Sequence, residues 1–488
     1  MPQYEAVIGL ETHIQLNTQS KIFCLLSLAL AIILLTGCGQ SPVSTPTSLP
    51  RLTSSITPIP TLTPTPLPTN TPESPMLVAC PAIKTEIPAD EIDGSIALSG
   101  DYYLYIPRLT QHYSPSYIWN IKDGTKINLP LDTDEYIEDY DVSPDGKWLA
   151  YYTDYQTGHP GKLFVIAENS RIPKKFSDRS WSGLVGWLNN EQLLIDKLAR
   201  SFPFPTIVLN PFSAKSEEIL AVYPEIDTAH DGIFGWGSFT TTETVYNSDL
   251  SMVIYPKVYG PSGLWDVALW DIHGKREITT FSNTSLATMN APAWSPDNQK
   301  FVVDLVVDST KESGVSNFFA KLPLENTEKP PLLATPKKPD RVPYPEDLFS
   351  IDRDGKTTRL TYFGDVYEKT FIGSYHWSPD SRYIAFWVQY SGMKESSSEI
   401  PELANPSVYE LALYDTATKQ VQNYCIKTIR PVSKIIWSPK SNQLLVAGFT
   451  DDIVSEQKYG IILLDIDKNY AVEISPNMIP IGWLANQP

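Results

Sequence analysis

Short runs of alternating apolar and polar residues, each ended by a polar turn, recur along the chain from about residue 79 onward. In one such run, Trp148, Ala150 and Tyr152 occupy every second position, the spacing that places side chains on one face of a β-strand. A second kind of run is a short apolar stretch that ends in Asp or Asn, and its copies lie at 118–120, 207–210, 268–271, 413–415 and 462–465. No long segment carries helical periodicity, which argues against an α/β fold. The pattern therefore predicts an all-β fold.

A turn motif, in which Ser-Pro follows Val or Trp and precedes Asp or Lys, appears four times. The residues of these four turns are Ser143, Pro144, Asp145, Gly146, Trp294, Ser295, Pro296, Asp297, Trp377, Ser378, Pro379, Asp380, Trp437, Ser438 and Pro439. Weaker relatives of the motif lie at 98–101, 186–190, 246–249 and 482–484. Pro presets the backbone angle early in a turn, and Asp or Asn accepts backbone hydrogen bonds. Each copy therefore predicts a tight hairpin, and the aromatic residue before Ser-Pro is expected to pack between neighbouring sheets.

Together the two kinds of run give about four strands per 45 to 60 residues, the size of one blade of a β-propeller. The interval between Ser295 and Ser378 is longer than one blade, and we assign the surplus to an insertion near 308–344 that is rich in Lys and Pro. Counting the intervals predicts a single β-propeller of about seven four-stranded blades over 79–488, with six or eight blades as alternatives. The repeat resembles that of TolB-like propellers, which are WD-repeat-like and also occur in relatives of prolyl oligopeptidase.

The segment before the propeller has the order of parts that a bacterial lipoprotein needs. Within the segment 22–38, residues 22–35 form an uncharged apolar run with the length of a signal-peptide core. The segment ends in Leu35, Thr36, Gly37 and Cys38, which resembles a lipobox and implies that Cys38 carries the lipid. Residues 39–78 are dominated by Pro, Thr and Ser, a composition typical of a disordered tether. The sequence thus predicts an extracytoplasmic protein, anchored by lipid to the bacterial membrane at the cell surface or in the periplasm.

Residues 4–24 do not belong to this scheme. They resemble the N-terminus of the B subunit of aspartyl/glutamyl-tRNA amidotransferase, and the resemblance does not continue past Cys24. It implies tRNA-dependent amidation, for which the remainder of the chain shows no counterpart. We interpret residues 1–21 as an extension that arose from a fusion, a misjoined gene or a wrongly chosen start.

Charge and cysteine content narrow the partners and the compartment. With 38 basic and 56 acidic side chains, the formal net charge is −18, and such a surface repels the phosphates of nucleic acid. Of the four cysteines, Cys80 and Cys425 fall in the folded part. In an oxidising compartment they can form a disulfide between the start of the propeller and its last third, the alternative being two separate buried thiols.

A search for catalytic motifs finds no nucleophile elbow of the type Gly-x-Ser-x-Gly, no His-Glu-x-x-His, no phosphate loop and no dinucleotide fingerprint. We therefore expect no catalytic residue, no metal site and no cofactor. The acidic run 132–141 is interpreted as a solvated connection between the first two blades, and the Asp residues of the turns as structural. All histidines are interpreted as loop or surface residues, namely His13, His112, His159, His230, His273 and His376.

The functional hypothesis is a non-catalytic binding module that recognises a protein or a glycan on the propeller face. Trp265, near two glycines, is a candidate aromatic contact for sugars or peptides. One alternative is an extracytoplasmic enzyme, such as a glycan lyase or hydrolase that uses loop carboxylates, or an accessory subunit of a peptidase. The other, which depends on residues 4–24 alone, is an amidotransferase subunit fragment. Two carboxylates or a His/Asp cluster in the central channel would favour an enzyme, whereas an apolar or mixed channel would favour binding.

Overall fold

The computed structural model describes most of the chain after residue 74. The described residues are 75–100, 116–132, 135–155, 161–167, 170, 172–178, 181–197, 206–213, 215–219, 245–259, 265–284, 291–307, 345–393, 408–429, 434–450, 460–476 and 478–485. The amidotransferase-like extension, the signal core, the lipobox and the insertion near 308–344 lie outside these residues, as does all of the tether before residue 75. Among the described residues, no helix is long and apolar enough to cross a membrane.

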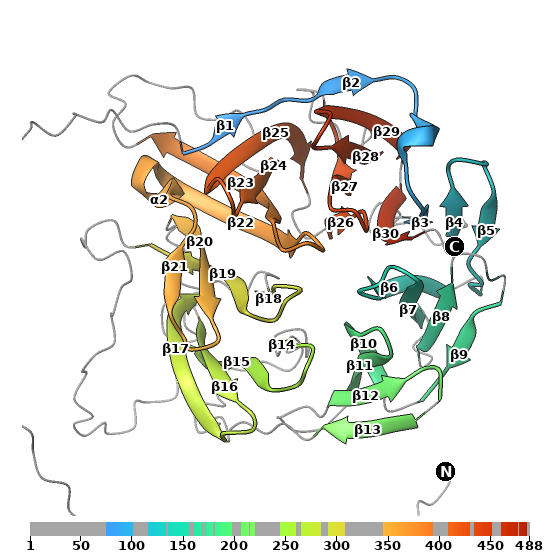
Figure 1. Ribbon diagram of the computed structural model, residues 1–488, viewed down its shortest axis with the longest axis horizontal. Helices are drawn as coiled ribbons and strands as arrows, with labels where there is room; N and C mark the ends of the chain where they lie inside the picture. Colours follow the sequence, from blue (N-terminus) through green and yellow to red (C-terminus); the bar gives the residue numbers. More distant parts are fainter. Residues whose placement is uncertain are drawn as a thin grey trace, which may run out of the picture. The chain divides into compact units, whose positions relative to one another are not determined.

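The described strands form seven four-stranded blades arranged in a ring (Figure 1), with blades 4 and 5 joined into one sheet by a pairing between Thr284 and Leu305. Blade 1 consists of β30 (Met478–Leu484), β3 (Ser95–Gly100), β4 (Tyr117–Asn120) and β5 (Lys126–Asn128). Blade 2 consists of β6 (Glu135–Val142), β7 (Trp148–Tyr155), β8 (Lys162–Ala167) and β9 (Lys174–Phe176). Blade 3 consists of β10 (Trp181–Asn189), β11 (Gln192–Lys197), β12 (Thr206–Asn210) and β13 (Lys215–Ile219).

The other four blades repeat this order. Blade 4 consists of β14 (Val245–Tyr246), β15 (Met252–Tyr259), β16 (Trp265–Asp271) and β17 (Arg276–Thr284). Blade 5 consists of β18 (Ala293–Trp294), β19 (Lys300–Val306), β20 (Glu346–Asp352) and β21 (Thr357–Arg359). Blade 6 consists of β22 (Tyr367–Trp377), β23 (Tyr383–Met393), β24 (Tyr409–Asp415) and β25 (Gln420–Thr428). Blade 7 consists of β26 (Ile436–Trp437), β27 (Gln443–Gly448), β28 (Gly460–Asp465) and β29 (Tyr470–Pro476).

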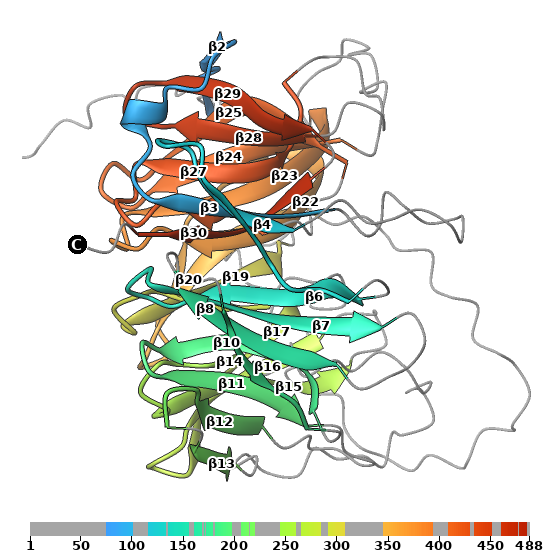
Figure 2. The same cartoon turned by 90° about the vertical axis from the view of Figure 1, so that its right-hand side faces the viewer.

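The prediction of an all-β propeller with seven blades is confirmed. Within the described residues, the helical elements are one 3₁₀ turn, η1 (Ala89–Glu91), and one short helix, α2 (Phe363–Val366). In the side view of Figure 2 the strands run across the molecule from one face of the ring to the other. The first strand of each blade lies nearest the centre of the ring (Figure 1).

The second strand of each blade is apolar on both faces because both faces meet a neighbouring blade. In β7, Leu149 and Tyr151 pack in a cluster with residues of blade 1, whereas Ala150 and Tyr152 pack in a cluster with residues of blade 3. Trp148 packs against the second cluster, as the alternation in the sequence predicted. Burial of each such large side chain contributes about 1.5–3 kcal/mol, so the repeated junctions stabilise the ring as a whole.

The ring closes by pairing the two ends of the propeller. The C-terminal strand β30 pairs antiparallel with β3 and serves as the innermost strand of blade 1. The Nε1 of Trp483 in β30 donates a hydrogen bond to the carbonyl of Asp93 at 2.8 Å, just before β3 begins. The weak motif copy at 482–484 is therefore the end of a closing strand, and it has no hairpin of its own.

A strap at the start of the described chain runs along the outer edges of blades 6 and 7 (Figure 1). Its strands β1 (Leu77–Val78) and β2 (Ala82–Lys84) pair in parallel with β25 and β29. Between them, Cys80 forms a disulfide with Cys425. Folded structure thus begins earlier than the predicted end of the tether at residue 78, because the backbone of 77–78 is held in a sheet.

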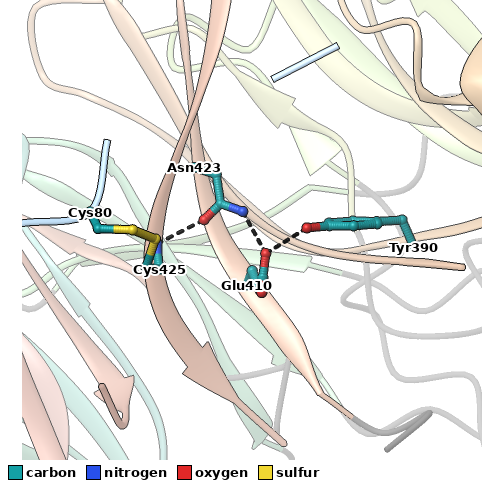
Figure 3. The surroundings of a disulfide bond; sticks show 5 residues. All are labelled: Cys80, Tyr390, Glu410, Asn423 and Cys425. Atoms are coloured by element: carbon teal, nitrogen blue, oxygen red, sulfur yellow. Dashed lines mark hydrogen bonds between the residues drawn. A yellow bond between two sulfur atoms is a disulfide. The ribbon is translucent and has the colours of Figure 1, made fainter. Parts of the chain in front are cut away.

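The disulfide sits on an irregular part of blade 6 (Figure 3). Cys425 has a left-handed backbone angle, φ 57°, where the pairing of β24 with β25 shifts register. The side chain of Asn423 supports this bulge, since its Oδ1 accepts the backbone N–H of Cys425 at 2.8 Å. The same side chain donates to Glu410, which also accepts a hydrogen bond from Tyr390.

Candidate binding site at the mouth of the central channel

The Ser-Pro-Asp turn of blade 2 shows what each residue of the repeat does. The Oγ of Ser143 accepts the backbone N–H of Trp148 at 3.0 Å and donates to Asp145 Oδ1 at 2.7 Å. Gly146 has φ 72°, the left-handed region that favours glycine, and its N–H donates to the carbonyl of Ser143 at 2.7 Å. The Asp145 carboxylate is thus used within the turn.

The same turn recurs in four other blades, with different residues at the left-handed position. In blades 5, 6 and 7 the first residue is Ser, and its Oγ accepts the backbone N–H five residues later in each case. In blade 4 it is Asn247, whose Oδ1 accepts the N–H of Met252 at 2.9 Å. The left-handed residues are Leu250, Asn298, Ser381 and Ser441. Gly or Asn, which tolerate this conformation well, occupy the position in two turns, and in the others the turn hydrogen bonds hold Ser or Leu there.

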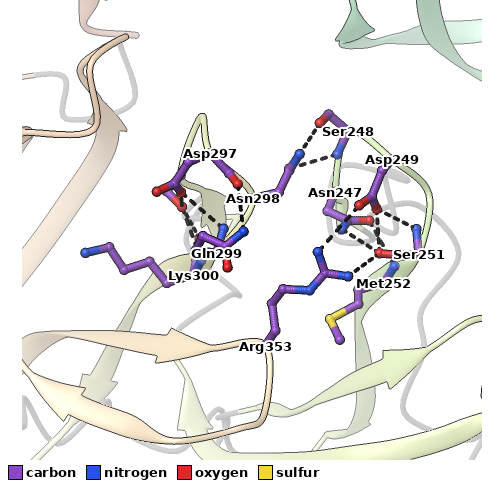
Figure 4. Close-up of polar contacts among 11 residues, drawn as sticks. Asn247, Ser248, Asp249, Ser251, Met252, Asp297, Asn298, Gln299, Lys300 and Arg353 are labelled. Atoms are coloured by element: carbon purple, nitrogen blue, oxygen red, sulfur yellow. Dashed lines mark hydrogen bonds and ion pairs between the residues drawn. The ribbon is translucent and has the colours of Figure 1, made fainter.

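Neighbouring turns are bonded to one another around the ring axis. The N–H of Asp145 donates to Asn190 Oδ1 of the next blade at 2.9 Å. Between blades 4 and 5, Ser248 donates its N–H to Asn298 Oδ1 at 3.1 Å, and the Asn298 amide donates back to the Ser248 hydroxyl (Figure 4). The N–H of Asp380 donates to Ser441 Oγ at 3.1 Å. These contacts join the turns of this rim in pairs, namely blade 2 with blade 3, blade 4 with blade 5 and blade 6 with blade 7.

Tryptophan side chains link each of four blades to the one before it. The indole Nε1 donates to a backbone carbonyl on the innermost strand of the preceding blade in each case. The pairs and distances are Trp187 to Asp141 at 3.2 Å, Trp294 to Val245 at 3.4 Å, Trp377 to Ala293 at 2.9 Å and Trp437 to His376 at 3.2 Å. The aromatic residue of the repeat therefore does pack between sheets, and its only N–H is used there.

The rim surrounds a cavity of about 550 Å³ at the turn-side mouth of the central channel, and all seven blades contribute to its lining. Prolines and tryptophans supply much of the wall, namely Pro144, Pro296, Pro379, Pro439, Trp187, Trp294, Trp377, Trp437 and Trp483. Apart from two tyrosines, three ionisable side chains, Asp141, His376 and Lys434, also line it. The channel is therefore mixed in character, with apolar walls and a few polar groups, which is the usual composition of a ligand site. It also holds one Asp and one His, the residue types whose clustering there would favour an enzyme.

The acidic run is not a solvated connection, and that interpretation was wrong. Its residues 135–142 form β6, the innermost strand of blade 2, and two of its carboxylates hold blade 3. Asp139 Oδ2 accepts the N–H of Leu184 at 3.1 Å, and Asp141 Oδ2 accepts the N–H of Trp187 at 2.7 Å. These N–H groups lie where the β10–β11 pairing is irregular, so they need acceptors outside their own sheet. Burial raises the pKa of Asp141, and the Lys434 charge partly opposes this.

His376 is not a loop or surface residue, so this interpretation was also wrong. It lies in β22 and faces the cavity, where its Nε2 and the hydroxyl of Ser374 share a hydrogen bond of 2.8 Å. Burial lowers the pKa of His376 to about 3, and the nearby Lys434 charge acts in the same direction. His273 does lie on an exposed turn, and His13, His112, His159 and His230 fall outside the described residues.

Lys434 was not singled out from the sequence. It lies just before β26, and its Nζ donates to the carbonyl of Tyr140 at 2.6 Å while standing 4.8 Å from the centre of the Tyr140 ring. A lysine on blade 7 thereby reaches blade 2. No motif could have revealed this, because the contact joins residues 294 positions apart. The candidate Trp265 is on β16, and its side chain lies outside what the structure describes.

A second pair of carboxylates, Asp139 and Asp196, lies between blades 2 and 3, away from the cavity lining. Asp196 in β11 is 5% exposed, and among the described residues its Oδ1 has no hydrogen-bond partner. Burial raises the pKa of Asp196 to about 8, and the charge of Asp139 adds to the effect. This carboxyl is therefore mostly protonated at neutral pH.

No model of a known protein family matches the chain, and no curated protein matches it. Solved structures do. The chain is similar to an oligogalacturonate lyase from Vibrio parahaemolyticus, with 11% identity, a TM-score of 0.44, and coverage of 79% of this chain and 87% of that one. It is also similar to TolB from Acinetobacter baumannii, with 11% identity, a TM-score of 0.38, and coverage of 83% and 88%.

A third similar structure is the β-propeller domain of the Trilobed protease from Pyrococcus furiosus, with 12% identity, a TM-score of 0.39, and coverage of 70% and 85%. TolB is thus among the structures to which this chain is similar. At these identities the likeness concerns the fold, and the chemistry of the channel has to be argued from its own residues.

Proposed function

We propose that the protein is an extracytoplasmic lipoprotein, anchored through Cys38, whose propeller binds a ligand at the turn-side mouth of its channel without transforming it. The observation that carries the binding role is the cavity of about 550 Å³, which joins apolar walls to three ionisable side chains. Its volume falls in the range of pockets that enclose small ligands or the ends of larger ones, about 300–1,000 Å³. Hydrogen bonds between pairs of neighbouring turns support the frame of this cavity.

The ionisable groups in the cavity support binding over catalysis. A general base works best when its pKa lies near the operating pH, whereas burial lowers the pKa of His376 to about 3. Asp141 already accepts hydrogen bonds from the backbone N–H groups of Val142 and Trp187. His376 is therefore poorly suited to moving protons at neutral pH, and Asp141 is engaged by the backbone, so both residues can shape and orient a ligand.

The disulfide supports the proposed extracytoplasmic location. A bridge between Cys80 and Cys425 persists in oxidising surroundings such as the periplasm or the cell surface. The test of the anchor is metabolic labelling with a palmitate analogue. We expect wild type and Cys24→Ala to carry the label and Cys38→Ala to lose it. Labelling that survives in Cys38→Ala would exclude this anchor.

An enzyme remains the second candidate because of one contact, the 2.8 Å hydrogen bond between Ser374 and His376. The two candidates are separated by incubating the full chain with neutral and charged oligosaccharides and peptides. Tryptophan fluorescence reports binding, since several tryptophans line the cavity, and mass spectrometry reports turnover. We expect a saturable fluorescence change with at least one compound, unchanged ligand masses, and the same binding in Ser374→Ala. Products that form with wild type and vanish in Ser374→Ala would establish an enzyme.

A further inference from the structure

Lys434 is a fixed cation inside the cavity. Its contacts to the carbonyl and ring of Tyr140 use one of the three N–H donors of an ammonium group. Among the described residues, no carboxylate forms an ion pair with it. Donors of Lys434 are thus available to an acceptor that enters the cavity.

The neighbouring groups Asp141 and His376 do not neutralise the positive charge of Lys434. Asp141 is held by two backbone N–H groups of blades 2 and 3, and burial favours its neutral form. His376 carries no charge at neutral pH, because its pKa is lowered to about 3. Both Asp141 oxygens are thus directed at backbone N–H groups, and the cavity presents one ammonium whose walls of low polarity strengthen attraction to an anion.

The walls restrict what the rest of the ligand can be. The indole N–H groups of Trp187, Trp294 and Trp437 are already bonded to backbone carbonyls, so these side chains offer apolar or aromatic surface. The rim prolines add apolar surface and lack a backbone N–H. The overall charge of −18 opposes a ligand with many negative charges.

We propose that the cavity binds a ligand with a single carboxylate on an apolar or aromatic body, such as an aryl-alkyl acid or the C-terminal residue of a peptide. The carboxylate pairs with Lys434, and the body packs against the tryptophans and prolines of the rim. This inference rests on the proposed function, because it names the ligand class of the same cavity.

The test compares matched acids and amides on the full chain in detergent. The probes are 3-phenylpropionate with 3-phenylpropionamide, and the tripeptide Ala-Ala-Phe with a free or an amidated C-terminus. Tryptophan fluorescence and calorimetry measure affinity. We expect at least one acid to bind about tenfold more tightly than its amide, a difference of about 1.4 kcal/mol. Preference in the tripeptide pair alone would identify a peptide as the source of the carboxylate, and preference in the phenylpropionate pair alone a small organic acid.

Variants of Lys434 test whether this residue causes the preference for the acid over the amide. Lys434→Gln should remove the preference for the acid, and Lys434→Arg should keep it. Lys122→Gln removes the same charge from the exposed turn between β4 and β5 and should leave the preference intact. If Lys434→Gln does not fold, the acid and amide affinities of wild type and Lys434→Arg still decide the matter.

Equal affinity for acid and amide, no binding of any probe at millimolar concentration, or a preference that survives in Lys434→Gln would overturn the inference. Saturable binding of uncharged ligands without turnover would then leave the proposed binding function standing, whereas turnover of ligands would overturn that function itself.

Discussion

Asp141 and Trp187 are bonded to each other in both directions across the junction of blades 2 and 3. The Asp141 carboxylate accepts the backbone N–H of Trp187 at 2.7 Å, and the Trp187 indole donates to the Asp141 carbonyl at 3.2 Å. Gly186, with φ 150°, leaves the space for this contact, because a Cβ there would lie 2.7 Å from Asp141 Oδ2. The arrangement combines a channel-lining carboxylate with a structural role in one residue.

We therefore expect Asp141→Ala to destabilise the fold. Loss of the acceptor leaves the Trp187 N–H unsatisfied, which costs about 1–3 kcal/mol in the free energy of unfolding. Gly186→Ala should also be destabilising, and less so in an Asp141→Ala background, because the clashing carboxylate is then absent. Urea denaturation of the four proteins measures both effects. Asp90→Ala, at an exposed position in η1, is the control and should change stability by less than about 0.5 kcal/mol. Strictly additive effects of the two variants would contradict this account of Gly186.

The disulfide should stabilise the attachment of the strap to blade 6. It joins residues 345 positions apart and fixes the strap on blade 6. Without it, the unfolded chain is no longer closed into a long loop, so the conformational entropy of the unfolded state rises. Reduction, or the double change Cys80→Ser with Cys425→Ser, should lower the free energy of unfolding by about 2–5 kcal/mol. Thermal unfolding with and without reductant measures this. The double variant serves as the control, since reductant should not change its melting temperature. An identical melting temperature for oxidised and reduced wild type would exclude a stabilising role.

Asp196 should make the protein less stable as pH rises. Its pKa is about 8 in the folded protein and 3.8 ordinarily, so between these values the folded state binds a proton that the unfolded state lacks. Stability from this group is present below about pH 4 and is lost as pH rises toward 8. Asp196→Asn, which cannot ionise, should therefore be more stable than wild type at pH 8, by about 1–3 kcal/mol, with a smaller difference at pH 5. A difference in stability between Asp196→Asn and wild type that is constant with pH would show that Asp196 titrates normally.

His376 should make the protein less stable as pH falls, the opposite of the effect of Asp196. Its pKa is about 3 in the folded protein and 6.5 ordinarily, so below 6.5 the unfolded state binds a proton that the folded state excludes. Stability from this group is present above pH 6.5 and falls toward pH 3, with a limiting slope of about 1.4 kcal/mol per pH unit. His376→Gln should thus lose less stability than wild type between pH 7 and pH 4. Parallel losses in urea midpoints for the two proteins would place His376 in a solvated environment.

The fold could be predicted because its signals are local and repeated. The turn that starts at Ser378 carries its own hydrogen-bond acceptors, and Trp377 before it has a partner one blade away. The closing strand β30 was harder to interpret, since its partner β3 lies at the other end of the chain. Counting repeats still gave the number of blades, because every blade has its own first hairpin or closing strand.

The site could be predicted only in part. The prolines and tryptophans of the rim were found from the repeat, although as structural residues. His376 and Asp141 were visible in the sequence, yet only the ring brings them to one cavity with Lys434, whose contact to Tyr140 crosses from blade 7 to blade 2. A single sequence has no local pattern that reports such a convergence.

The most direct test of the account is a crystal structure of the full chain soaked with 3-phenylpropionate. It should show seven blades closed by β30, with the ligand in the channel mouth and its carboxylate within hydrogen-bond distance of Lys434 Nζ. An open or differently ordered ring would contradict the fold, and a ligand bound away from the channel, or absent from it at saturating concentration, would contradict the site.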